Sequence, residues 1–80
     1  MHKYRVVHRT DGDEFVALRD GSGRFHVARS LKEKPPMRAL LHGARPHLGF
    51  GMLLCLESGE MYRVIFERIN EITNELDARR

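Results

Sequence analysis

Hydrophobic and polar residues alternate in three short runs along the first 29 residues of the chain. The runs span residues 3–9, 14–19 and 24–29 and are rich in β-branched and aromatic side chains, a composition typical of β-strands. Residues 10–13 and 20–23, which separate the runs, consist mainly of Asp, Gly and Ser and favour tight turns. The pattern therefore predicts three strands joined as an antiparallel meander.

The third run shows the clearest alternation of the three. In an extended strand Phe25 and Val27 fall on one side, and Arg24, His26 and Ala28 fall on the other. Large apolar side chains gain the most free energy from burial, so we expect Phe25 and Val27 to face the core. His26 is then expected on the solvent-exposed side of the sheet.

The segment after residue 30 is predicted to leave the sheet. Pro35 and Pro36 cannot donate ladder hydrogen bonds, which argues against a central strand there. Residues 37–42 predict a short helix, because Pro36 suits the first helical position and Gly43 suits the position just past the end.

Two more strands are predicted in the second half of the chain. In residues 48–57, Gly49 and Gly51 flank Phe50, and glycine within a strand often marks a bulge, a sharp bend or a close approach of another group. Ser58-Gly59 lies between two glutamates and predicts a two-residue hairpin turn. A strand over residues 61–68 would follow that turn.

The end of the chain admits two interpretations. Apolar residues from Tyr62 onward also recur at helical spacing, so the segment from about residue 61 could form one long helix. The hairpin signal and the dense Tyr-Val-Ile-Phe cluster favour a strand to about Arg68. A terminal helix over about 69–79, carrying Ile72 and Leu76, would then complete the chain.

These elements predict one mostly β (α+β) domain spanning residues 1–80. Five strands with a short helix between the third and fourth match the OB-fold, a small and partly open barrel, so we expect an OB-like barrel with a C-terminal helical tail. An SH3-like barrel is one alternative, and four strands followed by one long C-terminal helix is the other.

Composition and cysteine content indicate the compartment. Cys55 is the only cysteine, so no disulfide can close within the chain, and residues 1–5 show no apolar signal region. The longest apolar stretch, residues 48–56, is about half the length that a membrane helix requires. We therefore expect a cytoplasmic protein with no membrane partner.

The sequence contains no motif that predicts catalysis. Cys55 lies within an apolar run, where a thiol is expected to be buried with a raised pKa. Gly21-Ser22-Gly23 lacks the Lys-Ser/Thr continuation of a phosphate-binding loop, and no Gly-x-Ser-x-Gly sequence occurs. The protein is thus predicted not to be an enzyme and to need no cofactor.

Histidines raise the question of a metal site. All five lie within the first 47 residues, and His42 and His47 are five positions apart. A transition metal needs three or four convergent ligands, and neither a cysteine pair nor a helical His-x-x-x-His pattern is present. No metal site is predicted.

Charge is distributed unevenly along the chain. Residues 1–46 carry a net charge of +5 and residues 47–80 carry −2, which gives +3 in total. This asymmetry predicts a non-catalytic domain that binds single-stranded nucleic acid or another polyanion through a basic sheet face. The candidate contacts comprise the sheet residues Arg5, Arg9, Arg24 and His26, the rim residues Lys32, Lys34, Arg38 and Arg45, and Phe50 as a ring on which a base could stack.

The alternative function is a protein-interaction or homo-oligomerising module. Ile69, Ile72 and Leu76 form a narrow apolar stripe on the predicted terminal helix, between acidic side chains. Such a stripe could contact a protein partner or the same helix of a second copy.

Overall fold

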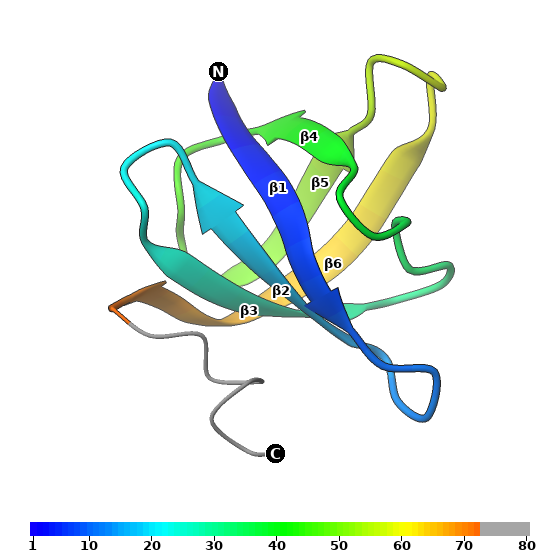
Figure 1. Ribbon diagram of the computed structural model, residues 1–80, viewed down its shortest axis with the longest axis horizontal. Helices are drawn as coiled ribbons and strands as arrows, with labels where there is room; N and C mark the ends of the chain where they lie inside the picture. Colours follow the sequence, from blue (N-terminus) through cyan, green and yellow to red (C-terminus); the bar gives the residue numbers. More distant parts are fainter. Residues whose placement is uncertain (73–80) are drawn as a thin grey trace.

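Six antiparallel strands close into a barrel in the computed structural model, which describes residues 1–72 (Figure 1). Neighbouring strands around the barrel are β1-β2-β3-β6-β5-β4, and β4 returns to pair with β1. The strands are β1 (His2–Arg9), β2 (Phe15–Asp20), β3 (Phe25–Ser30), β4 (Leu40–Gly43), β5 (Gly49–Leu54) and β6 (Met61–Glu71).

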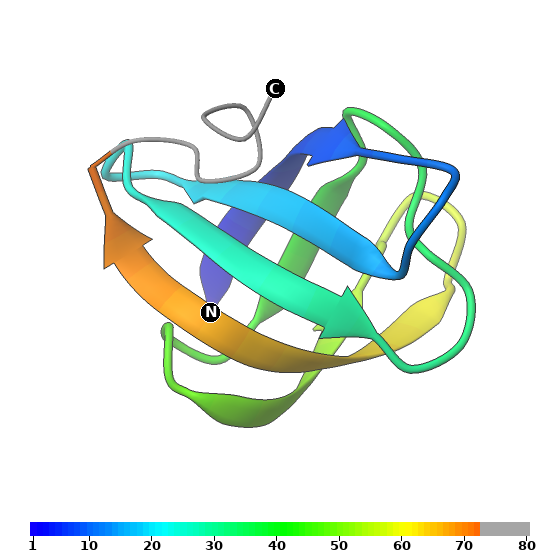
Figure 2. The same ribbon diagram turned by 90° about the horizontal axis from the view of Figure 1, so that it is seen from below.

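The strand order defines a Greek-key arrangement. The meander β1-β2-β3 is followed by a longer connection that carries the chain back to β4, beside β1. A second meander, β4-β5-β6, then completes the wall, with β6 against β3. As a result, the β1–β2 pair and the β5–β6 pair occupy opposite sides of the barrel (Figure 2).

The expected mostly β barrel and its N-terminal meander are confirmed, but the strand count and the helices are not. Six strands close the barrel where five were expected, and no residue among 1–72 is helical. The five-stranded OB-like assignment is therefore wrong in its details. The alternative of four strands and one long helix is also wrong, because residues 61–71 form β6.

The additional strand arises where a short helix was predicted. Arg38 adopts a positive φ of 68°, which interrupts any helix over 37–42. Leu40 and Leu41 then pair with Arg5 and Tyr4 of β1, and Leu41 is fully buried. Local helix propensity is worth only tenths of a kcal/mol per residue, whereas burying one leucine contributes about 2 kcal/mol, so tertiary packing decides the conformation.

The expected terminal helix does not begin at residue 69. Ile69 and Glu71 belong to β6, and Ile69 packs against the barrel core. The remainder of the predicted helix, including Leu76, lies outside the described residues. The strand interpretation of residues 61–68 is confirmed, and the strand continues three residues further than expected.

Glycine in β5 has the role suggested by its position in the sequence. A Cβ on Gly51 would lie 2.9 Å from Cε2 of Phe66, so only glycine allows that ring to pack against β5. Gly49 adopts a φ of 98°, in the region that other residues rarely enter. Both glycines therefore support the close approach and bend expected for this strand.

The core lies inside the barrel and contains few large groups. Its buried members, which come from all six strands and the residues next to them, are Tyr4, Val6, Val16, Leu18, Ala28, Leu41, Leu53, Cys55, Tyr62, Val64 and Phe66. A smaller cluster forms on the outer side of the N-terminal meander, where Val7 and Phe15 pack against Ala17 and Val27.

The faces of β3 are the reverse of those predicted. His26 is fully buried and Ala28 is part of the core, whereas Val27 belongs to the outer cluster and Phe25 is half-buried. The expectation that His26 lies on the exposed face with Arg24 is therefore wrong. Hydrophobicity alone assigned the faces incorrectly because the inward position at His26 is stabilised by a carboxylate that sequence alternation does not reveal.

That carboxylate is Asp20, at the end of β2. Its Oδ2 lies 2.7 Å from His26 Nε2, and the backbone N–H of Asn70 donates to His26 Nδ1 at 3.1 Å. Since Nδ1 accepts a hydrogen bond, the ring proton resides on Nε2 and is donated to Asp20. Asn70 lies where the β3–β6 register is irregular, so His26 accepts an N–H that the ladder leaves unpaired.

Ionised Asp20 is favoured despite its burial. Removal of the carboxylate from water raises its pKa, but hydrogen bonds from the Ser22 hydroxyl, His26 and backbone N–H groups outweigh that effect and lower the pKa to about 2. The Asp20 side chain is only 9% exposed, so solvent screens these interactions weakly. The Asp20–His26 pair therefore links the ends of β2, β3 and β6.

We predict that Asp20→Asn flattens the acid dependence of stability. A carboxyl whose pKa falls from 3.8 to about 2 on folding stabilises the protein above about pH 4, and this contribution disappears as the pH falls toward 2. The shift corresponds to about 2 kcal/mol. Urea unfolding at a series of pH values should show that wild type loses about this much more stability than Asp20→Asn; equal losses would contradict the assignment.

Candidate nucleic-acid interface

The predicted basic residues of β1 do not share one face. A register irregularity between Val6 and His8 changes which residues point outward, as a β-bulge does. Arg5 is exposed on the outer side, whereas Arg9 pairs with the core residue Val16 and is half-buried. The bulge, which sequence alternation did not reveal, thus separates two cations that were expected to act together.

Several predicted contacts instead hold the connection between β3 and β4 against the barrel. Arg5 Nη1 donates to the Arg38 carbonyl at 3.0 Å, and Arg9 Nη1 donates to the Pro35 carbonyl at 2.9 Å. Lys34 Nζ donates to the Asp13 carbonyl at 2.6 Å, which ties the connection to the β1–β2 turn. Arg9 and Lys34 are therefore structural cations, and Arg5 retains its other N–H groups for a ligand.

A row of three side chains crosses the outer face of the N-terminal meander. Arg5 pairs with Arg19 across β1–β2, and Arg19 pairs with Phe25 across β2–β3. Because paired residues point to the same side of a sheet, the three side chains leave the barrel on the same side. The Arg5 guanidinium contacts the Arg38 carbonyl, and that of Arg19 lies beside Gly23 in the β2–β3 turn. We call Arg5, Arg19 and Phe25 the Arg-Phe row.

A shallow hollow of about 380 Å³ adjoins the Arg-Phe row. Lys3, Arg5 and Arg19 supply the cations of its wall, together with Val7, Leu40, Gly21 and Asp20. The Asp20 carboxylate is already engaged by His26, Ser22 and the Arg24 backbone. Within residues 1–72 neither Arg19 nor Lys3 forms an ion pair, and three cations against the one Asp20 carboxylate leave this hollow with net positive charge.

The other predicted contacts are dispersed over the barrel. Arg24 is exposed in the β2–β3 turn near the Arg-Phe row, and Arg38 is exposed beside Arg5, to which it is hydrogen-bonded. Lys32 lies at the opposite end of β3, and Arg45 lies in the β4–β5 loop. His26 is buried and cannot contact a ligand.

Phe50 and the predicted partner stripe also lie away from the basic hollow. Phe50 is 51% exposed, as expected, but it projects from β5 on the opposite side of the barrel from β1 and β2. Ile72 is exposed, whereas Ile69 contacts the core, so these two residues do not form one exposed stripe.

Sequence reasoning missed the contribution of Lys3, Arg19 and Phe25. Lys3 and Arg19 belong to runs that were recognised as strands, but only the register shows that Arg19 faces Arg5 and Phe25. The available signal was the Asp20-Gly21-Ser22-Gly23 turn, whose length constrains which residues of β2 and β3 pair.

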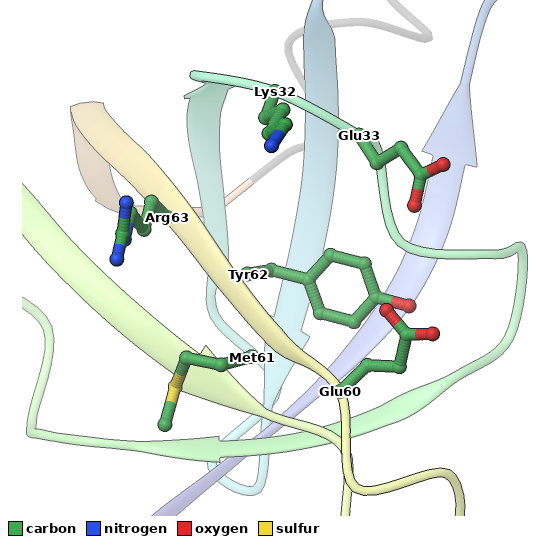
Figure 3. Close-up of a pocket in the computed structure, with 6 residues that line it drawn as sticks. All are labelled: Lys32, Glu33, Glu60, Met61, Tyr62 and Arg63. Carbon is green, nitrogen blue, oxygen red and sulfur yellow. The ribbon is translucent and has the colours of Figure 1, made fainter.

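A second cleft, of about 430 Å³, lies beside the start of β6 (Figure 3). The Tyr62 hydroxyl points toward Glu33 and Glu60, while Lys32 and Arg63 lie on the other side of the ring (Figure 3). Burial raises the pKa of Tyr62, and the two nearby carboxylates raise it further. Two acidic and two basic side chains balance here, so this cleft offers a polyanion no net attraction.

Cys55 is buried as expected, with 6% of its surface exposed, but its ionisation is the reverse of the prediction. Hydrogen bonds from the Ser58 hydroxyl, the Ser58 N–H and the Glu57 N–H lower the thiol pKa and outweigh the opposing effect of burial. The sequence suggested that Cys55 lies among apolar groups only, whereas Glu57 and Ser58 in the turn after β5 direct hydrogen-bond donors at its sulfur.

We predict that Ser58→Ala raises the pKa of the Cys55 thiol. The variant removes the hydroxyl that has the largest effect on the thiolate, while the backbone donors of the turn remain. Thiolate absorbance in the ultraviolet, followed as a function of pH, should titrate at higher pH in Ser58→Ala than in wild type. Ser22→Ala, in the other Ser-Gly turn, is the matched control; an unchanged titration in Ser58→Ala would contradict the assigned hydrogen bond.

The ring nitrogens of His26 and His47 are both occupied by hydrogen bonds. His47 Nδ1 lies 3.0 Å from the Arg45 carbonyl and Nε2 lies 2.8 Å from the Phe50 carbonyl. Carbonyls only accept, so both nitrogens donate and the pKa of His47 is raised. Within residues 1–72, no three His, Cys, Asp or Glu side chains are grouped so that they could share a metal ion.

Comparisons with known proteins assign no family to the chain. No family model, no curated protein and no solved structure matches it. Among the described residues there is also no helix long and apolar enough to span a membrane. The Arg-Phe row and its hollow are thus the arrangement on which a functional inference can be based.

Proposed function

We propose that this protein is a non-catalytic domain that binds single-stranded nucleic acid through the outer face of β1, β2 and β3. The observation that carries the proposal is the Arg-Phe row, in which two arginines and a phenylalanine are consecutive cross-strand partners on one face of the sheet. Guanidinium groups bind phosphates, and aromatic faces stack on bases, so the row combines both interactions that single-strand binding requires.

The pairing of Arg5 with Arg19 favours an anionic ligand. Like charges directly opposite one another destabilise a sheet, and neither guanidinium has a carboxylate partner within residues 1–72. A phosphate between them replaces repulsion by charge-assisted hydrogen bonds to both side chains. The repulsion between Arg5 and Arg19 in the free protein is thus replaced by attraction of both side chains to the phosphate when the ligand binds.

The position of Phe25 favours a single-stranded ligand over a double-stranded one. Its ring is half-buried, so one part is fixed by the protein while another part is open to solvent. A base can stack on such a ring only when it is not already stacked within a helix. Lys3, in the adjoining hollow, can neutralise a further phosphate along the strand.

Arg19→Ala and Phe25→Leu test the two parts of the row separately. Arg19→Ala should weaken binding of a mixed-sequence single-stranded oligonucleotide and reduce the slope of log K against log salt by about 0.7, the value for one lost phosphate contact. Phe25→Leu should lower affinity by about tenfold with the salt slope unchanged, because stacking releases no counterions. Fluorescence anisotropy with a labelled oligonucleotide between about 50 and 200 mM salt measures both effects.

Lys32→Ala is the matched control for the loss of one cation. Lys32 is exposed and lies at the neutral cleft beside β6, so its removal should leave the affinity close to wild type. Equal weakening by Arg19→Ala and Lys32→Ala would indicate nonspecific attraction to net charge and would exclude the Arg-Phe row. Absence of binding by wild type at the lowest salt would exclude the function itself.

A further inference from the structure

The outer face of β5 and the adjoining part of β6 is mostly apolar, although it points toward solvent. Strand alternation places Phe50, Met52 and Leu54 of β5 on this side, paired with Ile65, Arg63 and Met61 of β6. Phe50 is 51% exposed, Met52 is 43% exposed and Met61 is 49% exposed. We call these six residues the β5–β6 face.

The composition of the β5–β6 face is that of a protein interface. Aromatic residues, Met and Arg are enriched at the centres of such interfaces, whereas Lys, Asp and Glu are depleted. Arg63 is the only charged member of the face, and residues 48–56 contain no charged side chain at all. A contiguous apolar patch of this kind on a small domain marks a contact surface.

Opposite charges on β6 are arranged symmetrically about Ile65, at the end of this face where Ile65 pairs with Phe50. Arg63 and Glu67 are each two residues from Ile65, so all three point outward and the two charges lie about 7 Å on either side of Ile65. Glu67 forms an exposed ion pair with Arg29 at 3.0 Å, whereas Arg63 has no ion-pair partner within residues 1–72. Opposite charges at equal distances from a central apolar residue make the strand complementary to its own antiparallel copy.

We propose that the β5–β6 face binds a second copy of this chain, around a two-fold axis that passes through Ile65 and Phe50. Such an axis makes β6 antiparallel to β6 of the partner, so that Arg63 of each copy faces Glu67 of the other. Ile65 and Phe50 meet their symmetry equivalents at the centre, where Met52 adds apolar area. The contact is isologous, and its two ion pairs are generated by one self-complementary strand.

The geometry of packed sheets permits both ion pairs. Sheets that pack face to face cross at about 30°. Because of this crossing, a residue that lies about 7 Å from the axis is displaced by about 4 Å from the point directly opposite its partner. A long arginine side chain spans that displacement. Arg63 and Glu67 both stay partly hydrated in such a contact. The ion pairs therefore determine how the two copies align, and the apolar centre supplies most of the affinity.

Dimerisation through this face leaves the proposed nucleic-acid surface free. The β1–β2 pair lies on the opposite side of the barrel from β5–β6 (Figure 2), so the Arg-Phe rows of both copies would face outward. A dimer would therefore present two binding surfaces to one long strand, and binding at the first would raise the effective concentration at the second. The dimer proposal itself does not depend on nucleic-acid binding.

Sedimentation equilibrium of charge-reversal variants tests the dimer. Wild type should show a concentration-dependent mass that approaches twice the 9.3 kDa of the chain. Arg63→Glu and Glu67→Arg should each shift dissociation by at least tenfold toward monomer, because each places like charges across the axis. The double variant Arg63→Glu/Glu67→Arg should restore dimerisation relative to either single variant, since opposite charges again face each other across the axis.

Asp11→Arg is the control for reversal of an acidic residue, because Asp11 lies in the β1–β2 turn, remote from the face. It should dimerise as wild type does, and circular dichroism should confirm that each variant is folded. A wild-type protein that stays monomeric at every concentration would exclude the dimer. A dimer that persists in both single variants, or that the double variant fails to restore, would exclude this interface.

Discussion

The buried hydrogen bond between Asp20 and His26 determines which side chains of the N-terminal meander face solvent. A histidine inside a small apolar barrel is tolerated only because both ring nitrogens are satisfied, one by the Asp20 carboxylate and the other by the Asn70 N–H. With His26 inward, strand alternation turns Phe25 outward, beside Arg19. The stacking ring of the proposed nucleic-acid surface is therefore a consequence of a polar interaction within the core.

A second constraint is the path of the chain from β3 to β4. The connection must cross the end of the barrel before β4 can pair with β1, and it contains two prolines that offer no backbone donors. Arg9 and Lys34 donate to carbonyls of this connection and of the β1–β2 turn. Positive charge in this sequence thus has two roles, and counting cations along the chain cannot separate structural cations from those available to a ligand.

Much of the fold could be predicted, because tight turns and period-two alternation are local properties. The meander of β1–β3 and the β5–β6 hairpin follow from Asp, Gly and Ser in the turns and from β-branched residues between them. The β4 strand could not be predicted in this way, since Leu40 and Leu41 are good helix formers whose conformation is set by distant pairing with β1. Tertiary packing overrides propensity most readily in segments as short as this one.

The candidate surfaces were harder to predict than the fold, for a related reason. Arg5 and Arg19 are fourteen positions apart in the sequence, and their juxtaposition depends on register and on a bulge between Val6 and His8. A bulge adds one residue and exchanges the faces of the residues beyond it, so the alternation pattern assigned Arg5 to the outer face as the structure does, but not Arg9. Phe50 is exposed, as expected from the sequence, because Gly51 faces inward against the Phe66 ring and strand alternation then turns Phe50 outward.

The barrel separates its surface into two chemically different sides. Cations concentrate outside β1 and β2, whereas the outer side of β5 is free of charge from residue 48 to residue 56. Exposed Phe, Met and Leu side chains cost solubility in a monomer, and a small domain with a thin core has little reason to keep them unless a contact covers them. Arg63 and Glu67, which point outward from β6 on this side, are complementary to their own two-fold copies, so a second copy of the protein is the cover that this charge pattern favours.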